Sequence, residues 1–211
     1  KRNPKIGGIL WAGYPGESRG IALTEIICGD HNPGGKLPTT LYPNKFVKVP
    51  MTDMRMRPDP STGYPGRTYR FYKGGKVFKF GYGLSYSKYS YEFISVAQNK
   101  FNLNQLSATK AVNDSNSVHY LSVSDVGKET CEKAKISAVV GVKNEGEMDG
   151  KHPVLLFVRH EGAGKGSPVK QLVGFHSVRL KAGERGEIGF ELNPCEHFSR
   201  ANEDGLMVIE E

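Results

Sequence analysis

The sequence predicts an α/β segment followed by an all-β sandwich. Near the start, apolar residues recur at helical spacing, whereas from about residue 89 onward they alternate with polar residues. The chain also contains 26 glycines and 12 prolines, which divide these runs into short elements. Its 211 residues are 37% hydrophobic and 24% charged, which is the composition of a folded chain with enough apolar residues for a core.

The first forty residues have the pattern of a βαβ unit. Residues 6–11 form a short apolar run, as in a buried parallel strand. Residues 17–28 carry apolar side chains at helical spacing, and Gly29 follows where a left-handed C-cap is expected. After a turn at residues 32–35, residues 36–42 are predicted to return as a second strand.

Residues 43–83 lack periodicity and are predicted to form a long irregular segment. Residues 64–93 contain eleven of the chain's 21 aromatic residues, so this stretch must pack against something. Within it, Tyr64, Arg67 and Tyr69 combine aromatic faces with a guanidinium group, which suits the rim of a sugar pocket. Packing between two domains explains the same aromatics, and both interpretations stay open.

From about residue 89 a period of two predicts short antiparallel strands. Six strands are predicted, at residues 89–93, 136–142, 153–158, 171–180, 188–192 and 206–209. Short strands with turns between them and no helix favour a β-sandwich, although an immunoglobulin-like sandwich needs about seven strands. Residues 99–128 are polar and are predicted to be an insertion.

The three cysteines have different expected roles. Cys28 lies in the last turn of the predicted helix and is expected to be an inert core residue. Cys131 and Cys195 flank two predicted strands, and from the residues alone they either form a bridge or remain unpaired thiols. The runs at residues 28–31 and 195–197 each offer only part of the four-ligand set of a structural zinc site, so no metal is expected.

Charge and motifs exclude several classes of partner. The net charge of +7 comes from scattered basic residues, which does not indicate nucleic-acid binding. The G-x-x-G at residues 13–16 is not the G-x-G-x-x-G of dinucleotide sites, and Glu17 beside it would repel a phosphate. Apolar runs are too short to cross a membrane. We expect no cofactor, no nucleic acid and no membrane as partners.

Several longer motifs resemble glycoside hydrolase family 3. They are W-A-G-Y-P-G at residues 11–16, G-D-H-N-P-G-G-K-L-P-T-T at 29–40, V-P-M-T-D-M at 49–54, Y-P-G-R-T-Y-R-F-Y at 64–72 and F-G-Y-G-L-S-Y at 80–86. The third and fourth resemble the plant branch of β-D-xylosidases, some with α-L-arabinofuranosidase activity. V-K-Q-L-V-G-F at residues 169–175 and C-E-H at 195–197 resemble that branch's fibronectin type III-like domain.

The resemblance implies a C-terminal fragment of a longer enzyme. Residues 1–88 would be the C-terminal part of an α/β sandwich domain with its connecting segment, and residues 89–211 a fibronectin type III-like domain that lacks its last strand. An N-terminal (β/α)8 barrel is expected to be missing. With its last strand absent, the isolated chain is expected to expose an unpaired edge and to be poorly stable.

The implied activity is the retaining hydrolysis of terminal β-D-xylosyl residues from xylo-oligosaccharides or arabinoxylan. The family uses an aspartate nucleophile and a glutamate acid/base, and both motifs would lie upstream of Lys1. Glu17, Asp30, Asp53 and Asp59 are the carboxylates considered, but spacing pairs none of them, so no catalytic residue is assigned and the chain alone is expected to be inactive. The alternatives are a β-glucosidase fragment and a non-catalytic carbohydrate-binding or spacer module.

The resemblance also implies secretion to the cell wall, the apoplast. Secretion favours a disulfide between Cys131 and Cys195, because such bonds persist in oxidising compartments. It also makes the N-D-S sequon at Asn113 a credible N-glycosylation site.

Overall fold

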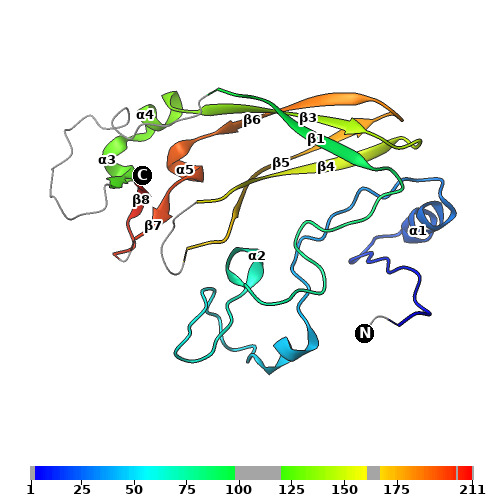
Figure 1. Cartoon of the computed structure of the whole chain (residues 1–211), viewed down its shortest axis with the longest axis horizontal. Coiled ribbons are helices and arrows are strands. Elements are labelled where there is room, and N and C mark those ends of the chain that lie inside the picture. Colours follow the sequence, from blue (N-terminus) through cyan, green and yellow to red (C-terminus); the bar gives the residue numbers. More distant parts are fainter. Residues whose placement is uncertain (1–2, 98–119, 161–166, 203, 211) are drawn as a thin grey trace.

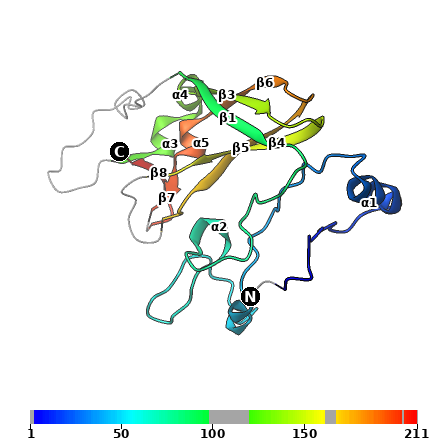
Figure 2. The same ribbon diagram turned by 45° about the vertical axis from the view of Figure 1, so that its right-hand side comes forward.

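The two halves of the chain differ in architecture. The computed structural model describes residues 3–97, 120–160, 167–202 and 204–210. Figure 1 shows a β-sandwich formed by the second half and, below it, an open first half of loops and short helices. In Figure 2, turned by 45°, the first half again runs beside the sandwich without entering it.

Helix α1, Arg19–Cys28, confirms the predicted helix but begins two residues later. Gly29 ends it as predicted, with a φ of 89° and its N–H donating to the carbonyl of Glu25 at 3.1 Å. No residue of α1 is buried, and Cys28 is exposed, so its prediction as a core residue is wrong. The apolar stripe that would cover a sheet meets no sheet among the described residues.

Residues 6–11 and 36–42 form no strands, so these two predictions are wrong. Trp11 is 61% exposed, and the second stretch has only a single bridge, between Leu41 and Phe78. A strand exists through hydrogen bonds to a neighbouring strand, and no described strand pairs with either stretch. The βαβ pattern is therefore present in the sequence while its sheet is not formed by the described residues.

The connecting segment, residues 43–83, is irregular as predicted. It contains the 3₁₀ helix η1, Asn44–Lys48, and the single-turn helix α2, Thr68–Phe71. Tyr72, only 3% exposed, lies edge-on to the ring of Tyr42 with the ring centroids 5.0 Å apart. Aromatic contacts of this kind hold the segment together in place of a regular backbone ladder.

Two facing antiparallel sheets form the sandwich. In the first, β3 (Ile136–Asn144) lies between β1 (Tyr89–Val96) and β6 (Arg185–Leu192). In the second, β4 (Gly150–Val158) pairs with β5 (Gln171–Leu180). Residues of β3 alternate between buried and exposed over most of its length, as the period of two predicts.

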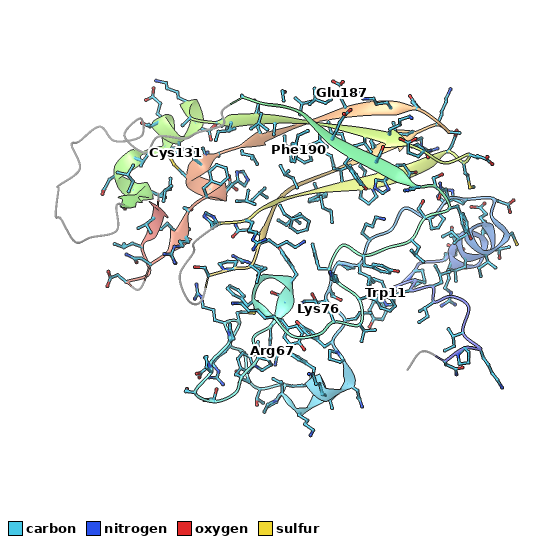
Figure 3. All side chains as sticks on the ribbon, viewed as in Figure 1. Trp11, Arg67, Lys76, Cys131, Glu187 and Phe190 are labelled. Atoms are coloured by element: carbon cyan, nitrogen blue, oxygen red, sulfur yellow. A yellow bond between two sulfur atoms is a disulfide. The ribbon has the colours of Figure 1, made fainter. Side chains whose placement is uncertain are left out.

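Nine buried residues from four strands form the core between the sheets: Ile136, Val140, Val142, Val154, Leu156, Leu180, Ile188, Phe190 and Leu192. Figure 3 shows Phe190 between the two sheets. Packing of two inner faces against each other is the architecture expected of a β-sandwich. This confirms the all-β prediction for the second half of the chain.

A third small sheet and three short helices close one end of the sandwich. The strands are β2 (Tyr120–Ser122), β7 (Arg200–Ala201) and β8 (Met207–Glu210), and the helices are α3 (Val123–Val126), α4 (Lys128–Lys133) and α5 (Pro194–His197). A disulfide joins Cys131 of α4 to Cys195 of α5, with the Cα atoms 5.7 Å apart. Both cysteines pack with Val126 and Ile209 in a second buried cluster.

All six predicted strands are present, and the structure adds β2 and β7. The predicted insertion at residues 99–128 extends too far, because residues 120–128 contribute β2, α3 and the start of α4. The boundary was placed too late because this stretch is mostly polar and contains only a few apolar residues. Those residues pair with β8 and line the second cluster. The predicted glycosylation site at Asn113 lies outside the described residues.

Candidate functional site

The residues predicted at a sugar pocket lie on the connecting segment, just before and within α2. Figure 3 places Arg67 below α2, away from the sandwich core. Tyr64, Arg67 and Tyr69 are close in sequence, yet their side chains contact different neighbours.

Tyr64 closes a loop that begins near Asp53. Its N–H donates to the carbonyl of Asp59 at 3.0 Å, and its carbonyl accepts the Asp59 N–H at 2.9 Å. Its hydroxyl donates to the carbonyl of Arg55, whose guanidinium carbon lies 4.7 Å from the ring centroid. Tyr64 is only 6% exposed, so nearly all of its surface is covered.

Arg67 holds the same loop from the other side. Its Nη2 donates to the carbonyl of Pro50 at 3.1 Å and to the carbonyl of Asp53 at 2.9 Å. Its guanidinium carbon also lies 5.6 Å from the ring centroid of Phe46. Tyr64 and Arg67 therefore act on one loop, which their side chains brace through hydrogen bonds to three backbone carbonyls.

Thr68 follows Arg67 in a backbone conformation that β-branched residues rarely adopt. Its φ is 60°, in the left-handed region, and it is the one non-glycine residue with positive φ in the described chain. Its N–H donates to the hydroxyl of Tyr42 at 2.6 Å, which helps to hold this conformation. Because the chain turns at Thr68, the side chains of Arg67 and Tyr69 contact different parts of the structure.

Tyr69 and Arg70 join the connecting segment to the sandwich. The hydroxyl of Tyr69 accepts the N–H of Leu172 in β5 at 3.0 Å, and its ring stacks on Phe80 with centroids 4.3 Å apart. Arg70 donates from Nη2 to the side-chain oxygen of Gln171 at 3.0 Å. These contacts agree with packing between two domains, which is one of the two interpretations that the sequence left open for the aromatic residues.

Asp53 and Asp59 share a single cation. The guanidinium of Arg55 reaches Asp53 Oδ2 at 2.8 Å and Asp59 Oδ2 at 2.7 Å. Hydrogen bonds from Arg55 lower the pKa of Asp53, and hydrogen bonds from Ser61 and Thr62, in that order, lower the pKa of Asp59 to about 2. Both carboxylates therefore stay ionised near neutral pH.

The two remaining carboxylates from the sequence, Glu17 and Asp30, are exposed just before and just after α1. A general acid of a glycosidase needs a raised pKa, which burial in an apolar pocket commonly supplies. None of the four carboxylates considered has such surroundings. In the described part of the chain, no group of three or more His, Cys, Asp or Glu side chains is placed to hold a metal ion.

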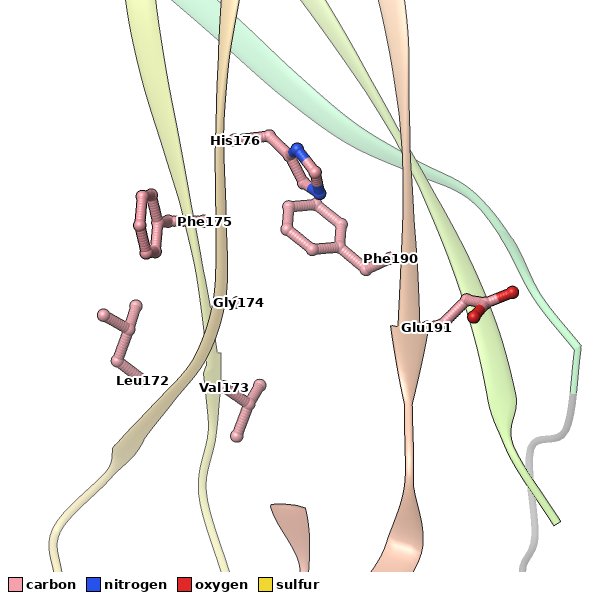
Figure 4. A pocket seen from close by; sticks show the side chains of 7 residues that line it. All are labelled: Leu172, Val173, Gly174, Phe175, His176, Phe190 and Glu191. Atoms are coloured by element: carbon pink, nitrogen blue, oxygen red, sulfur yellow. The ribbon is translucent and has the colours of Figure 1, made fainter. Parts of the chain in front are cut away.

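A cavity of about 420 Å³ opens between the edges of the two sheets. Figure 4 shows its lining side chains, which come from β5 and β6: Leu172, Val173, Gly174, Phe175, His176, Phe190 and Glu191. Phe175 points to the opposite side of β5 from His176, which faces Phe190. No predicted site residue lines this cavity.

Asn32 is a contact residue that the sequence reading missed. Its Oδ1 accepts the Ser85 hydroxyl at 2.7 Å and the Tyr86 N–H at 3.0 Å. Its Nδ2 donates to Ser87 Oγ at 3.0 Å and to the carbonyl of Met148 at 3.4 Å. The amide thus uses both donors and accepts twice, although N-P-G-G predicted only a turn.

Comparison with known proteins relates both halves of the chain to families. The model of the glycosyl hydrolase family 3 C-terminal domain matches residues 1–86, and that of a fibronectin type III-like domain matches residues 152–211. Probable β-D-xylosidase 7 of Arabidopsis thaliana is 59% identical over 99% of this chain and 27% of its own length. β-Xylosidase/α-L-arabinofuranosidase 1 of Medicago sativa subsp. varia is 41% identical over 97% of this chain and 26% of its own.

A solved structure has the same arrangement. It is a GH3 exo-β-xylosidase in complex with a xylobiose aziridine activity-based probe, and it matches with a TM-score of 0.70 and 28% identity. The match covers 95% of this chain and 27% of that one, so the chain spans about a quarter of the length of these relatives. The matches confirm the predicted fold class. In the described residues, no helix has the length and apolar character needed to cross a membrane.

Proposed function

Because residues 1–86 belong to the C-terminal domain of glycosyl hydrolase family 3 and residues 152–211 to a fibronectin type III-like domain, we propose that this chain is the C-terminal part of a retaining exo-acting β-D-xylosidase. The substrate of the whole enzyme is the terminal β-D-xylosyl residue of xylan-derived oligosaccharides, including those of arabinoxylan. The observation that carries the proposal is the 59% identity, over 99% of the chain, with a protein named as a probable β-D-xylosidase.

The reacting carboxylates belong to the rest of the enzyme in this proposal. Retaining hydrolysis needs a nucleophile and an acid/base about 5–5.5 Å apart, and the acid must hold a proton until it reaches the leaving group. Asp53 and Asp59 do not suit that second role, because Arg55 binds both and their pKa values are lowered. The chain supports the cleft and is inactive alone.

The connecting segment is the part of this chain that we place at the cleft. Its support is the left-handed Thr68, because strained backbone of this kind concentrates at functional loops. Contact of Tyr64, Arg67 and Tyr69 with sugar stays a prediction. Tyr64 and Arg67 brace the loop, and Tyr69 joins the connecting segment to the sandwich. These residues would therefore affect sugar binding mainly by holding the loop in place.

A second activity, release of α-L-arabinofuranosyl residues, belongs to the same proposal. Its support is the 41% identity with the Medicago protein, whose name carries both activities. Both substrates end in a pentosyl residue, so one pocket can serve both. We expect the arabinofuranoside to be hydrolysed less efficiently than the xyloside.

Hydrolysis by the purified full-length protein tests the proposal. We expect release of p-nitrophenol from its β-D-xyloside, with a kcat/KM at least about tenfold above that for the β-D-glucoside, since one added hydroxymethyl group discriminates by about 1–3 kcal/mol. The 211-residue chain, assayed beside it, should release none. A preference for the glucoside would assign a β-glucosidase instead. Binding of xylobiose without hydrolysis would favour a carbohydrate-binding module.

We further propose that the protein is secreted to the cell wall. The disulfide between Cys131 and Cys195 supports this, because structural disulfides persist mainly in oxidising compartments. Glycosylation at Asn113 is part of the same proposal. Peptide mass spectrometry of the protein from tissue tests both: a bare Asn113 together with free thiols at both cysteines would contradict secretion.

A further inference from the structure

Helix α2 lies between the sandwich and the loops of the first half (Figures 1 and 2). Three hydrogen bonds connect it to the start of β5. The Val169 N–H donates to the carbonyl of Arg70 at 2.7 Å, and Arg70 Nη2 donates to Gln171 Oε1 at 3.0 Å. The Leu172 N–H donates to the hydroxyl of Tyr69 at 3.0 Å. We call this contact of α2 with the start of β5 the joint.

A β-bulge lies beside the joint. The register between β4 and β5 shifts where Leu156 pairs with Gly174 and Phe157 pairs with Leu172, so Val173 is the extra residue. Bulges bend a strand and re-aim its groups, and they occur often next to functional sites. Because the bulge directly follows Leu172, whose N–H binds α2, regular pairing is interrupted at the point where β5 holds the connecting segment.

Ring contacts hold the same joint. The ring of Tyr69 stacks on Phe80 with the centroids 4.3 Å apart and lies edge-on to Phe157 of β4 with the centroids 5.9 Å apart. Nζ of Lys170 lies 3.7 Å from the ring centroid of Phe157. A helix of four residues is too short to be stable by itself. The position of α2 is therefore set by the sandwich that holds it.

The N-terminal end of α2 holds residues 50–67, which we call the braced loop. Arg67 donates from Nη2 to the carbonyl of Asp53 at 2.9 Å and from its backbone N–H to the carbonyl of Met56 at 2.9 Å. Thr68 follows with a φ of 60°, a conformation that persists in a β-branched residue only where its surroundings hold it. A displacement of α2 would therefore pass directly to the braced loop.

We propose that the sandwich positions the braced loop through the joint, and that Tyr69 and Gln171 are positioning residues that set the affinity of the whole enzyme for its sugar. The inference rests on the proposed function, because it takes the braced loop to lie at the cleft. It gives the fibronectin type III-like domain, which contains β5, a role in substrate binding without contact with the sugar. Neither residue acts on the reacting atoms, so binding should change and the chemical step should not.

Hydrolysis of xylobiose by the purified full-length protein tests the effect on affinity. The double change Tyr69→Phe with Gln171→Leu keeps the stacked ring and removes two of the three hydrogen bonds, each worth a factor of about five. The KM for xylobiose should rise at least about fivefold, while kcat stays within about twofold. Gln171→Glu keeps an oxygen that accepts from Arg70, so it should retain the KM of the parent.

Hydrogen exchange of residues 56–67 in the full-length protein follows the loop independently of the reaction. In the double variant, protection of this stretch should fall at least about fivefold. Tyr86→Phe removes a hydroxyl that donates to the carbonyl of Ile26 in α1, so it is the matched control. It should change neither the KM nor the protection.

Two results would overturn the proposal. Unchanged protection of residues 56–67 in the double variant would show that the sandwich does not hold the braced loop. Lower protection with an unchanged KM would show that the loop does not set the affinity. If the unmodified protein does not hydrolyse xylobiose, the proposed function fails, and the protection alone then decides whether the joint positions the loop. If the double variant fails to fold, Tyr69→Phe alone is judged by the same criteria.

Discussion

Replacing Gly34 with alanine is expected to push residues 32–36 away from the start of β4 and to lower the free energy of unfolding by about 1–3 kcal/mol. The added Cβ would lie 1.8 Å from the carbonyl oxygen of Lys151, far inside contact distance. That oxygen belongs to the backbone of β4, where Lys151 pairs with Arg179, so it has no rotamer through which to move away. The loop of residues 32–36 must lift instead.

Gly35→Ala is the matched control for this change. A Cβ at Gly35 meets nothing within 4 Å, so the same chemical change one residue later should leave stability within about 0.5 kcal/mol. Urea unfolding of the two variants and the parent, followed by circular dichroism, measures the difference. Equal midpoints for Gly34→Ala and Gly35→Ala would show that the close contact with Lys151 does not exist in solution.

Removing the disulfide should have the largest effect at the closed end of the sandwich. A double change, Cys131→Ala with Cys195→Ala, is expected to cost about 2–5 kcal/mol, because the bridge spans 64 residues and restricts the unfolded chain. Both sulfurs also lie in the buried cluster with Val126 and Ile209, so their removal leaves space there. Thermal unfolding under non-reducing conditions measures this loss.

Cys28→Ser provides the comparison, since Cys28 is free and exposed on α1. Its melting temperature should match that of the parent. A reducing agent should lower the melting temperature of the parent and of Cys28→Ser alike, and it should not affect the double variant. If the double variant melts with the parent, the bridge contributes nothing to stability and our account of this end of the fold is wrong.

The strands of the sandwich could be predicted because their pattern is local. In β3, the buried residues Ile136, Ala138 and Val140 alternate with exposed or half-buried neighbours. This period of two indicates that one face of the strand is buried. The same rule found β6, whereas β4 and β5 were predicted as buried strands from their apolar runs. The short strands β2 and β7 were missed because two or three residues carry too little periodicity to be recognised.

The first half of the chain shows the limit of local pattern. Residues 6–11 have the composition of a parallel strand, but a strand also needs a neighbour, and no described strand pairs with them. Helix α1 illustrates the opposite case. Its hydrogen bonds are internal, so it forms where the sequence predicts it even though none of its residues is buried.

The candidate site was predictable in composition but not in geometry. The sequence identified Tyr64, Arg67 and Tyr69 as residues of interest, yet only the fold shows that the first two brace a loop and that Tyr69 bonds to Leu172, 103 residues away. Asn32 carried only the signal of a turn. Its partners at residues 85–87 and 148 lie far along the chain, and a buried polar side chain cannot be told from a turn residue by spacing.

Identification of the residue that carries the covalent sugar tests the central claim most directly. A 2-fluoro xylosyl fluoride traps the glycosyl–enzyme intermediate of a retaining enzyme, and peptide sequencing of the labelled full-length protein locates the modified carboxylate. We predict a single label on an aspartate outside these 211 residues. A label on Asp53, Asp59 or any other carboxylate of this chain would contradict the account.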